Sequence, residues 1–592
     1  MGRINPHKGR RLKFLKINLH RVSGFLVLTR LTIKVDMLGL NSYPIVTIGV
    51  NTLYVIIIPT LVVWYTYWHL SRKHMIKLAE RIPGPKGWPL VGNALEFIGS
   101  SHNIFKTAYG YSHTYKSIAK IWLGPKLLIF LVDPSDIEVI LSSSVHIDKA
   151  KEYRLFQPWF GNGLLISTGK MWKNHRKLIA PAFHLNVLKG FIDLFNANSR
   201  EVIEKLKKEE GKTFDCHDYM SEATVEVLLE TVMGVSKHDQ GQSGYDYAMA
   251  VMKMCDIIHL RHTKIWLRPT WLFNFTNYSK IQTKLLDSLH SLTKNVVRTK
   301  IEAFNKGIRG SIAHVPMEIL SGDVLTSDVE VEVKNPEKGI SYGQSLGIKD
   351  DIDLDENDVG EKKRLPFLEL MIDAYQNRSA LTNQDIKDQV STILFEGHDT
   401  TAAASSFFLC LMAAHPDIQK RVHQEVDTIF GRSNRPATFA DTLEMKYLEM
   451  CLLETLRLYP PVPVIAREIN EDVVLPSGYT LPAGCTVVIG TIKTHRNPDI
   501  YPNPDVFNPD HFLPVRTASR HYYSFIPFSA GPRSCVGRKY AILKLKILLS
   551  TIMRNFVVTS DKVENNYELQ ADIILKRADG FPIKLEPRIL TG

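Results

Sequence analysis

The pattern of apolar and polar positions separates a short N-terminal segment from a long body. Residues 44–68 read PIVTIGVNTLYVIIIPTLVVWYTYW and carry no charge. About 20 such residues suffice to cross a bilayer, and the aromatic residues that end the run are typical of a membrane–water interface. The pattern predicts a transmembrane anchor over residues 44–69. A basic, proline-rich hinge is predicted over residues 70–95, because its prolines and glycines cannot continue a helix.

Beyond the hinge, apolar positions recur mostly at helical spacing. Residues 391–415 read STILFEGHDTTAAASSFFLCLMAAH, a nearly continuous apolar run that predicts a buried helix. Thr382 and Asp385 form a capping-box pattern ahead of this run. A second helical pattern begins at Lys539.

Strand patterns are few and short. They occur at residues 117–133 and 486–496. The sequence contains no internal repeat. The body over residues 96–592 is therefore predicted to be one domain, mainly α with a small β part.

One segment, residues 307–363, differs in composition from the rest of the body. It contains DDIDLDENDVGE, with seven acids between Asp350 and Glu361. Such a segment cannot bury enough apolar surface to fold alone. It predicts an acidic, exposed insertion between helices, and a plain disordered loop is the alternative.

Charge is concentrated at the N-terminus. The first 36 residues hold nine Lys and Arg residues and one acid, so they carry +8 of the net charge of +12. The charge of the remaining body is too small to indicate nucleic-acid binding. The six cysteines include no pair at C-x-x-C spacing, which argues against a zinc site and fits a reducing compartment.

The basic residues around the apolar run predict its orientation. Five Lys and Arg residues follow the run closely, which favours a cytoplasmic body anchored in the endoplasmic reticulum membrane. The N-terminal extension over residues 1–43 supports an alternative. Its first 36 residues are Arg-rich and acid-poor, as mitochondrial presequences are.

The stretch FSAGPRSCVG, Phe528–Gly537, carries the strongest chemical signal. A cysteine just before a helix N-terminus has its thiolate stabilised by the helix dipole. Glycines at Gly531 and Gly537 permit a tight turn or the close approach of a flat ligand. Arg533 can pair with an anionic group. These residues together suit a cysteine that binds a metal.

The spacing Phe-x-x-Gly-x-Arg-x-Cys-x-Gly resembles the haem-thiolate signature of the cytochrome P450 family, with no departure. The resemblance implies that Cys535 is the axial ligand of haem b iron and that Arg533 holds a haem propionate. It implies that Phe528 shields the thiolate. It also implies the cytochrome P450 fold with an N-terminal transmembrane helix.

The predicted helix over residues 391–415 adds a second match. Glu396, Asp399 and Thr400 fall on one face by helical spacing, and Gly397 leaves room for a flat ligand. The segment resembles the family's Ala/Glu-Gly-x-Asp-Thr motif, whose Asp-Thr pair delivers protons to bound dioxygen. Glutamate in place of alanine is typical of family 4, where it is often ester-linked to a haem methyl. The alternative is a buried protonated carboxyl.

A third match concerns the family's buried Glu-x-x-Arg pair. Glu454 and Arg457 are one helical turn apart in CLLETLRLYPPVP. The family's third partner is an arginine, which His511 replaces here. The resemblance therefore predicts a rewired structural triad.

Further matches concern the haem propionates. Trp172 and Arg176 match the family's Trp-x-x-x-Arg pair, and Arg467 matches another propionate contact. The resemblance implies electrons from NADPH through a separate cytochrome P450 reductase, with cytochrome b5 as a further partner. Basic residues expected to form the reductase dock are Lys170, Lys173, Lys177, Arg538, Lys539, Lys544 and Lys546.

The substrate prediction rests on resemblance to the insect G subfamily of family 4. The long acidic insertion and the segment around Cys535 carry it. It implies oxidative decarbonylation of long-chain fatty aldehydes to cuticular hydrocarbons at a membrane. Alternatives are fatty-acid ω-hydroxylation and oxidation of hormones or foreign compounds. Two alternatives belong to other functional classes. One is a haem-thiolate isomerase, which the intact Asp399-Thr400 pair disfavours, and the other is a non-catalytic haem-binding membrane protein.

Overall fold

The structure is a computed structural model. It describes residues 44–241, 243–308, 340–346, 348, 365–378, 381–562, 564 and 567–588. The chain divides into two compact units, Met1–Ile76 and Lys77–Gly592. The predicted extension over residues 1–43 lies outside the described residues, as does most of the predicted insertion.

The described part of the first unit is helical. Helix α2 (Pro44–Ser71) covers the apolar run and contains Pro59. Several of its apolar side chains are exposed, including Val63 and Tyr67. Within the part of the chain that the structure describes, no helix combines the length and the apolar character needed to cross a membrane. The predicted transmembrane anchor is therefore not confirmed.

The predicted hinge is more ordered than expected. Helix α3 (Lys73–Glu80) occupies its first half. The following Pro83 carbonyl accepts a hydrogen bond from the Lys120 backbone N–H at 2.8 Å. A Cβ on Gly84 would lie 2.3 Å from the Lys120 carbonyl oxygen, so this glycine permits the close approach of the two segments. The segment with the prolines does not continue the helix, but it is held against the rest of the chain at Lys120.

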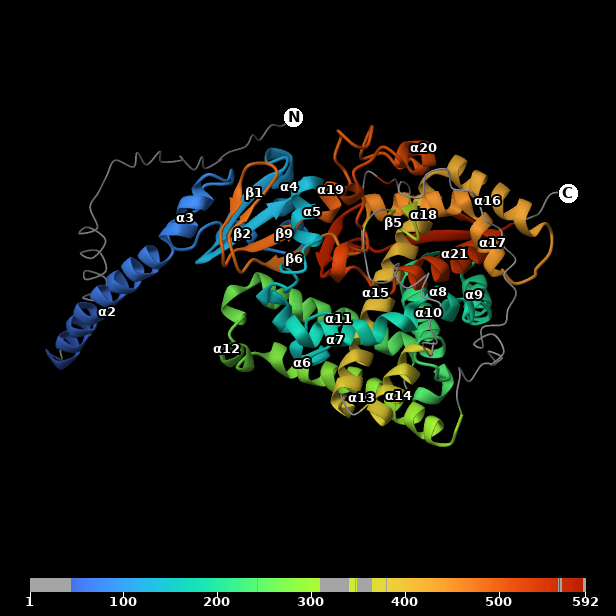
Figure 1. Ribbon diagram of the computed structural model, residues 1–592, viewed down its shortest axis with the longest axis horizontal. Coiled ribbons are helices and arrows are strands. Elements are labelled where there is room, and N and C mark those ends of the chain that lie inside the picture. Colours follow the sequence, from blue (N-terminus) through green and yellow to red (C-terminus); the bar gives the residue numbers. More distant parts are fainter. Residues whose placement is uncertain are drawn as a thin grey trace, which may run out of the picture. The chain divides into compact units, whose positions relative to one another are not determined.

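The second unit is mainly α, as predicted, and Figure 1 labels its elements. Its longer helices are α4 (Ser101–Thr114), α5 (Pro134–Leu141), α7 (Gly169–Ile179), α9 (Ile192–Leu206), α10 (Cys216–Glu230), α11 (Gly244–Thr263), α13 (Asn277–Asn305), α14 (Phe367–Arg378), α15 (Asn383–Ala414), α16 (Pro416–Phe430), α18 (Lys446–Leu458) and α21 (Arg538–Asn555). Shorter helices are α6 (Gln157–Phe160), α8 (Leu185–Lys189), α12 (Thr270–Asn274), α17 (Phe439–Glu444), α19 (Thr491–Thr494) and α20 (Pro514–Thr517).

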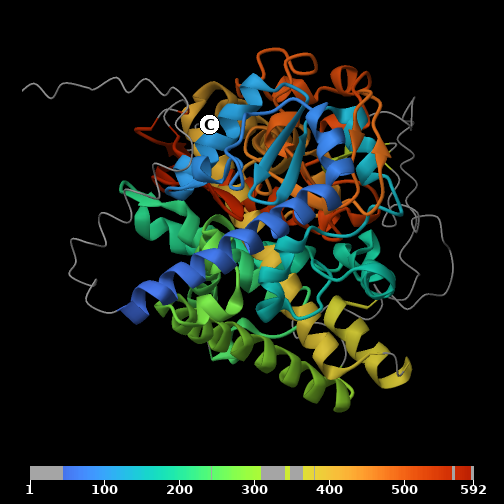
Figure 2. The same ribbon diagram turned by 90° about the vertical axis from the view of Figure 1, so that its left-hand side faces the viewer.

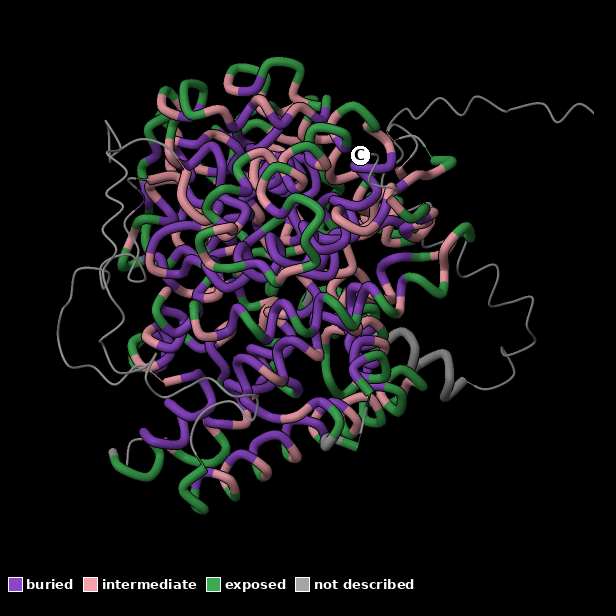
Figure 3. Tube along the Cα trace, turned by 90° about the vertical axis from the view of Figure 1, so that its right-hand side faces the viewer, coloured by how far each residue is buried: buried purple, intermediate pink, exposed green. Residues whose placement is uncertain are grey.

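Helix α15 is the longest of these and is buried along most of its length. The predicted capping box is present, because Thr382 Oγ1 accepts from the Asp385 N–H and the Asp385 carboxylate accepts from the Thr382 N–H. Helix α15 packs against α10, α13 and α18. In Figure 3 buried stretches of the trace fill the inside of the body, and exposed stretches lie mostly at its edge. Because α15 is held on several sides, it forms a fixed wall for any site beside it.

The β part consists of small sheets. The largest has the order β1-β2-β9-β6, in which β2 and β9 are parallel and the other pairs are antiparallel. Figures 1 and 2 show it beside α4 and α5. Its strands are β1 (Ile118–Leu123), β2 (Lys126–Leu131), β9 (Thr486–Ile489) and β6 (Ile465–Glu468). The other strands are β3 (Thr213–Asp215), β4 (Ile340–Ser341), β5 (Gln344–Ser345), β7 (Val473–Val474), β8 (Thr480–Leu481), β10 (Phe556–Thr559), β11 (Leu569–Asp572), β12 (Ile574–Arg577) and β13 (Pro582–Pro587).

Two of the strand predictions made from the sequence can be compared with these strands. Residues 117–133 form β1 and β2, as predicted. Residues 486–496 were predicted as one strand, and this is wrong for the second half. The strand ends at Ile489, and α19 begins after Gly490, whose carbonyl accepts hydrogen bonds from later N–H groups.

The predicted insertion also differs from expectation where it is described. The strands β4 and β5 form a small hairpin within it. Gln344 and Ile348 are buried there, and Ile340 and Tyr342 pack against the main hydrophobic core. This piece of the insertion is thus docked on the body and not exposed.

Candidate active site

A cavity of about 490 Å³ lies between α15 and the segment that leads into α21. One face of α15 lines it through Ile393, Glu396, Gly397, Thr400, Thr401 and Ala404. The opposite wall includes Phe528, Arg533, Cys535 and Gly537. A third side is lined by the segment before β6 and the first two residues of β6, together residues 461–466. The structure therefore brings the two chemical motifs of the sequence to one cavity.

Cys535 is the cysteine whose side chain is accessible, whereas the other five are buried. Its thiol faces the cavity, and its N–H donates to the Phe528 carbonyl at 2.9 Å. Although the sulfur is accessible from the cavity, the surrounding protein separates it from bulk water, and this desolvation raises the pKa of the thiol to about 11; the charge of Glu396 acts in the same direction. A hydrogen bond from the Gly537 backbone and the charges of Arg176 and Arg538 act in the opposite direction. A bound metal ion would reverse this balance, because it binds the thiolate.

The two glycines of the cysteine motif have different roles. Gly531 adopts a φ of +68°, and a Cβ there would lie 2.0 Å from the Leu141 carbonyl oxygen. A Cβ on Gly537 would instead meet the Cys535 sulfur and Phe183 at 4.0 Å. Gly531 is therefore required by the turn, and Gly537 leaves free space beside the sulfur for a flat ligand.

Four cations lie at one side of the cavity. Lys149, Arg176 and Arg533 line it, and Arg467 is buried next to Lys149 through a β-bridge. The Arg533 guanidinium lies 4.2 Å from the ring centroid of Trp172. Arg176 donates to the Ser534 carbonyl at 2.7 Å, which ties α7 to the cysteine motif. The predicted propionate ligands thus lie together, and Lys149 joins them.

These cations repel one another. Burial lowers the pKa of Arg533 to about 9, and Arg467 and Arg176 contribute to the shift. Burial likewise lowers the pKa of Lys149, with contributions from Arg467 and Arg533. Burial raises the pKa of Glu396 to about 7, although the cations oppose this shift. The site therefore favours a ligand that brings negative charge.

Haem fits these features. Its propionates would neutralise the cations, its flat apolar ring matches the space beside Gly537, and its iron would bind the accessible Cys535 sulfur. Arg176, Arg467, Arg533 and Lys149 would hold the propionates. Phe528 lines the cavity next to Cys535 in the sequence-predicted position.

The face of α15 differs from the prediction at Asp399. Glu396 and Thr400 line the cavity, and Thr400 Oγ1 donates to the Glu396 carbonyl at 2.7 Å. Asp399 does not line it and points to β12, where its carboxylate lies 2.9 Å from Lys576 Nζ. The i, i+3 step turns a side chain about 60° from the first, which is enough to place Asp399 beside the cavity instead of in it.

Gly397 also has a role other than the one predicted. Its backbone lines the cavity, but a Cβ there would meet the Leu228 side chain at 2.9 Å. The glycine therefore permits the close packing of α15 on α10. The space that it opens is filled by Leu228 and not by a ligand.

The Glu454–Arg457 pair is completely buried. Arg457 donates from Nε and Nη2 to the two carboxylate oxygens of Glu454, each at 2.7 Å. His511 Nδ1 lies 3.0 Å from Glu454 Oε1, and its Nε2 lies 2.9 Å from the Pro502 carbonyl oxygen. His511 thus occupies the place of the third partner and links the pair to the segment before α20.

The predicted reductase dock is wrong in its second half. Arg538, Lys539, Lys544 and Lys546 are all at most 4% exposed. Lys546 pairs with Glu449 at 2.6 Å inside the protein. The basic residues of α7, Lys170, Lys173 and Lys177, are exposed. Charge in the sequence does not reveal which side of a helix is buried.

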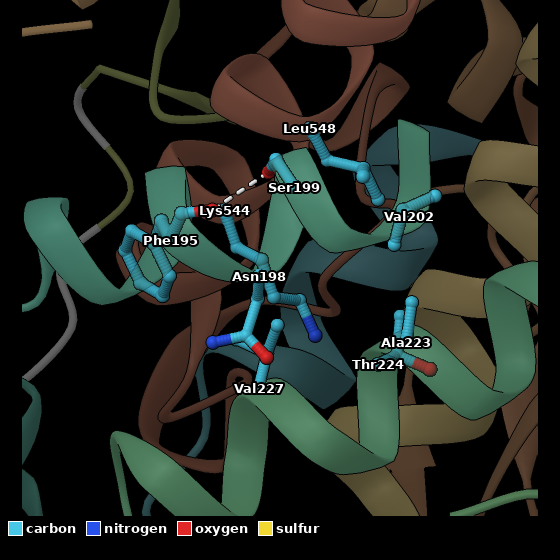
Figure 4. Close-up of a pocket in the computed structure, with 9 residues that line it drawn as sticks. All are labelled: Phe195, Asn198, Ser199, Val202, Ala223, Thr224, Val227, Lys544 and Leu548. Carbon is cyan, nitrogen blue, oxygen red and sulfur yellow. Dashed lines mark hydrogen bonds between the residues drawn. The ribbon is translucent and has the colours of Figure 1, made fainter. Parts of the chain in front are cut away.

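A much smaller pocket lies between α9, α10 and α21 (Figure 4). Its volume of about 10 Å³ corresponds to roughly one water molecule, so it cannot hold a substrate. Lys544 reaches this pocket and is 2% exposed. Its Nζ donates to the Gly397 carbonyl at 3.0 Å and to Thr401 Oγ1 at 2.8 Å, and burial lowers its pKa to about 7.

Sequence reasoning missed two lysines around the site, Lys149 and Lys576, and assigned a third, Lys544, to a surface dock instead of the protein interior. Lys149 faces the cations, Lys576 pairs with Asp399, and Lys544 is bonded to α15. Each is far in sequence from the residue that it contacts and belongs to no motif. A lone lysine gives no local signal of burial, so no sequence pattern could have identified them.

An accessible cysteine sulfur and a nearby cluster of buried cations, at one cavity, define the site of a haem-thiolate protein. Comparisons agree. Residues 82–584 match the family model described as Cytochrome P450. The chain is 58% identical over 558 residues to Cytochrome P450 4g15 of Drosophila melanogaster, which covers 91% of this chain and 97% of that relative.

Two further relatives extend the comparison. Cytochrome P450 4g1 of Drosophila melanogaster is 47% identical over 555 residues, covering 93% of this chain and 96% of the relative. Cytochrome P450 4V2 of Homo sapiens is 34% identical over 508 residues, covering 85% of this chain and 89% of the relative. The chain belongs to the cytochrome P450 family, within family 4, and is a cytochrome P450 monooxygenase with thiolate-ligated haem.

Proposed function

We propose that this monooxygenase acts on long-chain lipids, with oxidative decarbonylation of fatty aldehydes to hydrocarbons as its main reaction. The proposal rests on the resemblance to the G subfamily and on the cavity walls. Side chains that give the cavity an apolar character are Phe156, Phe395, Leu456, Val462, Ile573 and Ile574. Such a wall suits an alkyl chain, because burial of apolar surface supplies the binding energy.

The chain's own residues would support oxidation as follows. When bound, haem supplies the activation of dioxygen, and its thiolate ligand favours cleavage of the O–O bond. Thr400 Oγ1 faces the cavity and can pass a proton into it. Asp399, the residue before Thr400 in the chain, is ion-paired with Lys576.

Fatty-acid ω-hydroxylation is the second candidate, and Arg268 favours it. Arg268 lines the same cavity, its Nη2 donates to the His262 carbonyl at 2.6 Å, and its buried Nε has no partner among the described residues. A guanidinium with a spare donor suits a carboxylate. An aldehyde that reacts at its polar end would not use this contact.

Product analysis by mass spectrometry distinguishes the two reactions. Fatty aldehydes should give hydrocarbons that are shorter by one carbon, and turnover should need NADPH and a reductase. Fatty acids should give hydroxy acids of unchanged length only if ω-hydroxylation operates. In that case Arg268→Gln should weaken acid binding, measured by the haem spin-state shift, whereas exposed Arg154→Gln should not. Turnover without NADPH would instead support an isomerase, and absence of any product would support a haem-binding protein.

We also propose electron delivery from NADPH through cytochrome P450 reductase, with cytochrome b5 as a further partner. The exposed lysines of α7 support this, because the same helix carries Trp172 and Arg176 on its buried face. A positive surface patch accelerates encounter with an acidic partner. Replacing Lys170, Lys173 and Lys177 by Gln should slow haem reduction in a salt-dependent manner, with no change in the oxidised spectrum.

Localisation at the endoplasmic reticulum membrane, with a cytoplasmic body, is part of the proposal. Large exposed apolar side chains around α12 support membrane contact, namely Trp266, Trp271 and Phe275. Exposed aromatic residues of this kind suit a membrane interface. Glycosylation sequons at Asn274, Asn277 and Asn377 should then stay unmodified. A mobility shift on glycosidase treatment would contradict this topology, and import into mitochondria would support the presequence alternative.

A further inference from the structure

The β4–β5 hairpin has a tight and well-defined geometry. Ile340 pairs with Ser345, and Ser341 pairs with Gln344. The two turn residues, Tyr342 and Gly343, both have positive φ angles of 46° and 74°. This combination is typical of a type I′ turn, which matches the twist of the two strands. The hairpin is therefore a specific local structure within the insertion.

The turn of this hairpin lies against the aromatic ring that precedes Cys535. A Cβ added to Gly343 would be 2.5 Å from Phe528 Cε2 and 3.1 Å from Cδ2. It would also be 3.5 Å from Ile542 Cδ1 in α21. Gly343 thus has two reasons to be glycine, because its φ is positive and the ring leaves no space for a side chain.

A second contact fixes the hairpin at the other end of the cysteine motif. Arg538, the first residue of α21, donates from Nη1 to the Ser341 carbonyl at 2.8 Å. The Arg538 side chain is 1% exposed. Gln344 is 4% exposed, so the hairpin is partly embedded in the body. The contacts at Gly343 and Ser341 therefore brace residues on both sides of Cys535.

These braced residues control the surroundings of the sulfur. The Cys535 N–H donates to the Phe528 carbonyl at 2.9 Å, and both residues line the cavity. Donor strength of a thiolate ligand depends on its hydrogen bonds, burial and solvent access. A displacement of the Phe528 ring or of the start of α21 would alter all three.

We propose that the β4–β5 hairpin is a positioning element for the haem thiolate. Gly343 holds the Phe528 ring against the cysteine motif, and Ser341 holds Arg538 at the start of α21. The inserted segment thereby acts on the electronic environment of Cys535, although it lies far from it in sequence. This role is independent of which lipid the enzyme oxidises.

Gly343→Ala in the full-length haem protein tests the proposal. The added methyl group should displace the Phe528 ring. The long-wavelength Soret band of the reduced carbon-monoxide complex, which reports thiolate ligation, should be partly lost, and the haem midpoint potential should shift. Gly307→Ala is the matched control, because Gly307 also has a positive φ of +76° but nothing lies within 4 Å of its added Cβ. The control should keep the wild-type spectrum and potential.

Two further variants separate positioning from general instability. Arg538→Gln removes the hydrogen bond to the Ser341 carbonyl without adding volume. It should also change the long-wavelength Soret band of the reduced carbon-monoxide complex. Combining Gly343→Ala with Phe528→Leu should give non-additive spectral changes, because the smaller side chain relieves the clash. Haem content and circular dichroism should match the wild type in all of them. Unchanged spectra and potentials in folded Gly343→Ala and Arg538→Gln, or equal changes in Gly307→Ala, would overturn the proposal.

Discussion

The carboxylate of Asp399 lies 2.9 Å from Nζ of Lys576; the Asp399 side chain is buried and that of Lys576 is 12% exposed. Burial alone would raise the pKa of Asp399, but Lys576 and His398 hold it below its ordinary value. The second carboxylate oxygen, Oδ2, has no hydrogen-bond partner among the described residues. The acid of the predicted proton relay is therefore ionised and tied to a strand outside the motif.

Lys576→Met should be strongly destabilising. Removing one partner of a buried ion pair leaves an uncompensated charge, which costs about 3–5 kcal/mol. Asp399 contributes stability above the unfolded pKa of its carboxyl, and this contribution is lost as pH falls through its lowered folded pKa. In the variant the sign reverses, because without Lys576 the burial of Asp399 raises the pKa of its carboxyl, so protonation at lower pH relieves the penalty and the unfolding temperature should partly recover on acidification. The double variant Lys576→Met with Asp399→Asn is the control and should be more stable than Lys576→Met alone.

Cys535→Ser should abolish the thiolate signature. Cys535 is the cysteine whose side chain is accessible in the cavity. A serine oxygen is a poorer ligand for the iron, so the long-wavelength Soret band of the reduced carbon-monoxide complex should disappear. Cys485→Ser is a control at a buried cysteine. Persistence of the band in Cys535→Ser would exclude this residue as the ligand.

Thr400→Ala should uncouple electron use from product formation. Thr400 Oγ1 is the hydroxyl of the motif that faces the cavity. Loss of a proton-transfer group costs about 10²–10⁴-fold in the rate of the step. NADPH consumption should continue while its electrons appear as peroxide. The same amount of product per NADPH in wild type and variant would show that Thr400 moves no proton.

The buried Lys544 should make stability depend on pH. Burial lowers its pKa from 10.5 to about 7. Between these values the unfolded chain binds more protons than the folded one, so wild-type stability should rise with pH by up to about 1.4 kcal/mol per unit. Below the folded-state pKa of Lys544, about 7, this contribution to the pH dependence of stability should vanish. The difference in unfolding temperature between wild type and Lys544→Met should show this trend, and exposed Lys173→Met should not.

Glu396 should attach the haem covalently during turnover, when oxidation by O2 and NADPH-derived electrons would remove two electrons and a proton from a haem methyl C–H and the Glu396 carboxylate would form the ester bond in its place. It lines the cavity one turn before Thr400, and burial raises its pKa to about 7, so a neutral carboxyl is well populated near neutral pH. Acid–acetone extraction after many turnovers should leave a protein-bound haem fraction. Glu396→Ala should release all of its haem while retaining the thiolate band. Complete release from the wild type would exclude the ester.

The sequence by itself determined the features whose partners are close in the chain. The pattern of the cysteine motif lies within ten residues, Phe528–Gly537, and identifies the sulfur that faces the cavity. The capping box of Thr382 and Asp385, and the Glu454–Arg457 pair, each act within one helical turn. Local geometry decides such contacts, so the pattern of residue types suffices to predict them.

Tertiary structure alone decided the partners that lie elsewhere in the chain. Asp399 meets Lys576, and Gly397 receives Leu228 instead of a ligand, because α15 packs against β12 and α10. The lysines at 544 and 546 are buried although their sequence suggests a basic surface. The β4–β5 hairpin contacts Phe528, which is far away in the sequence, for the same reason. Helical spacing places a side chain on a face, but only the packing of neighbouring elements determines what that face touches.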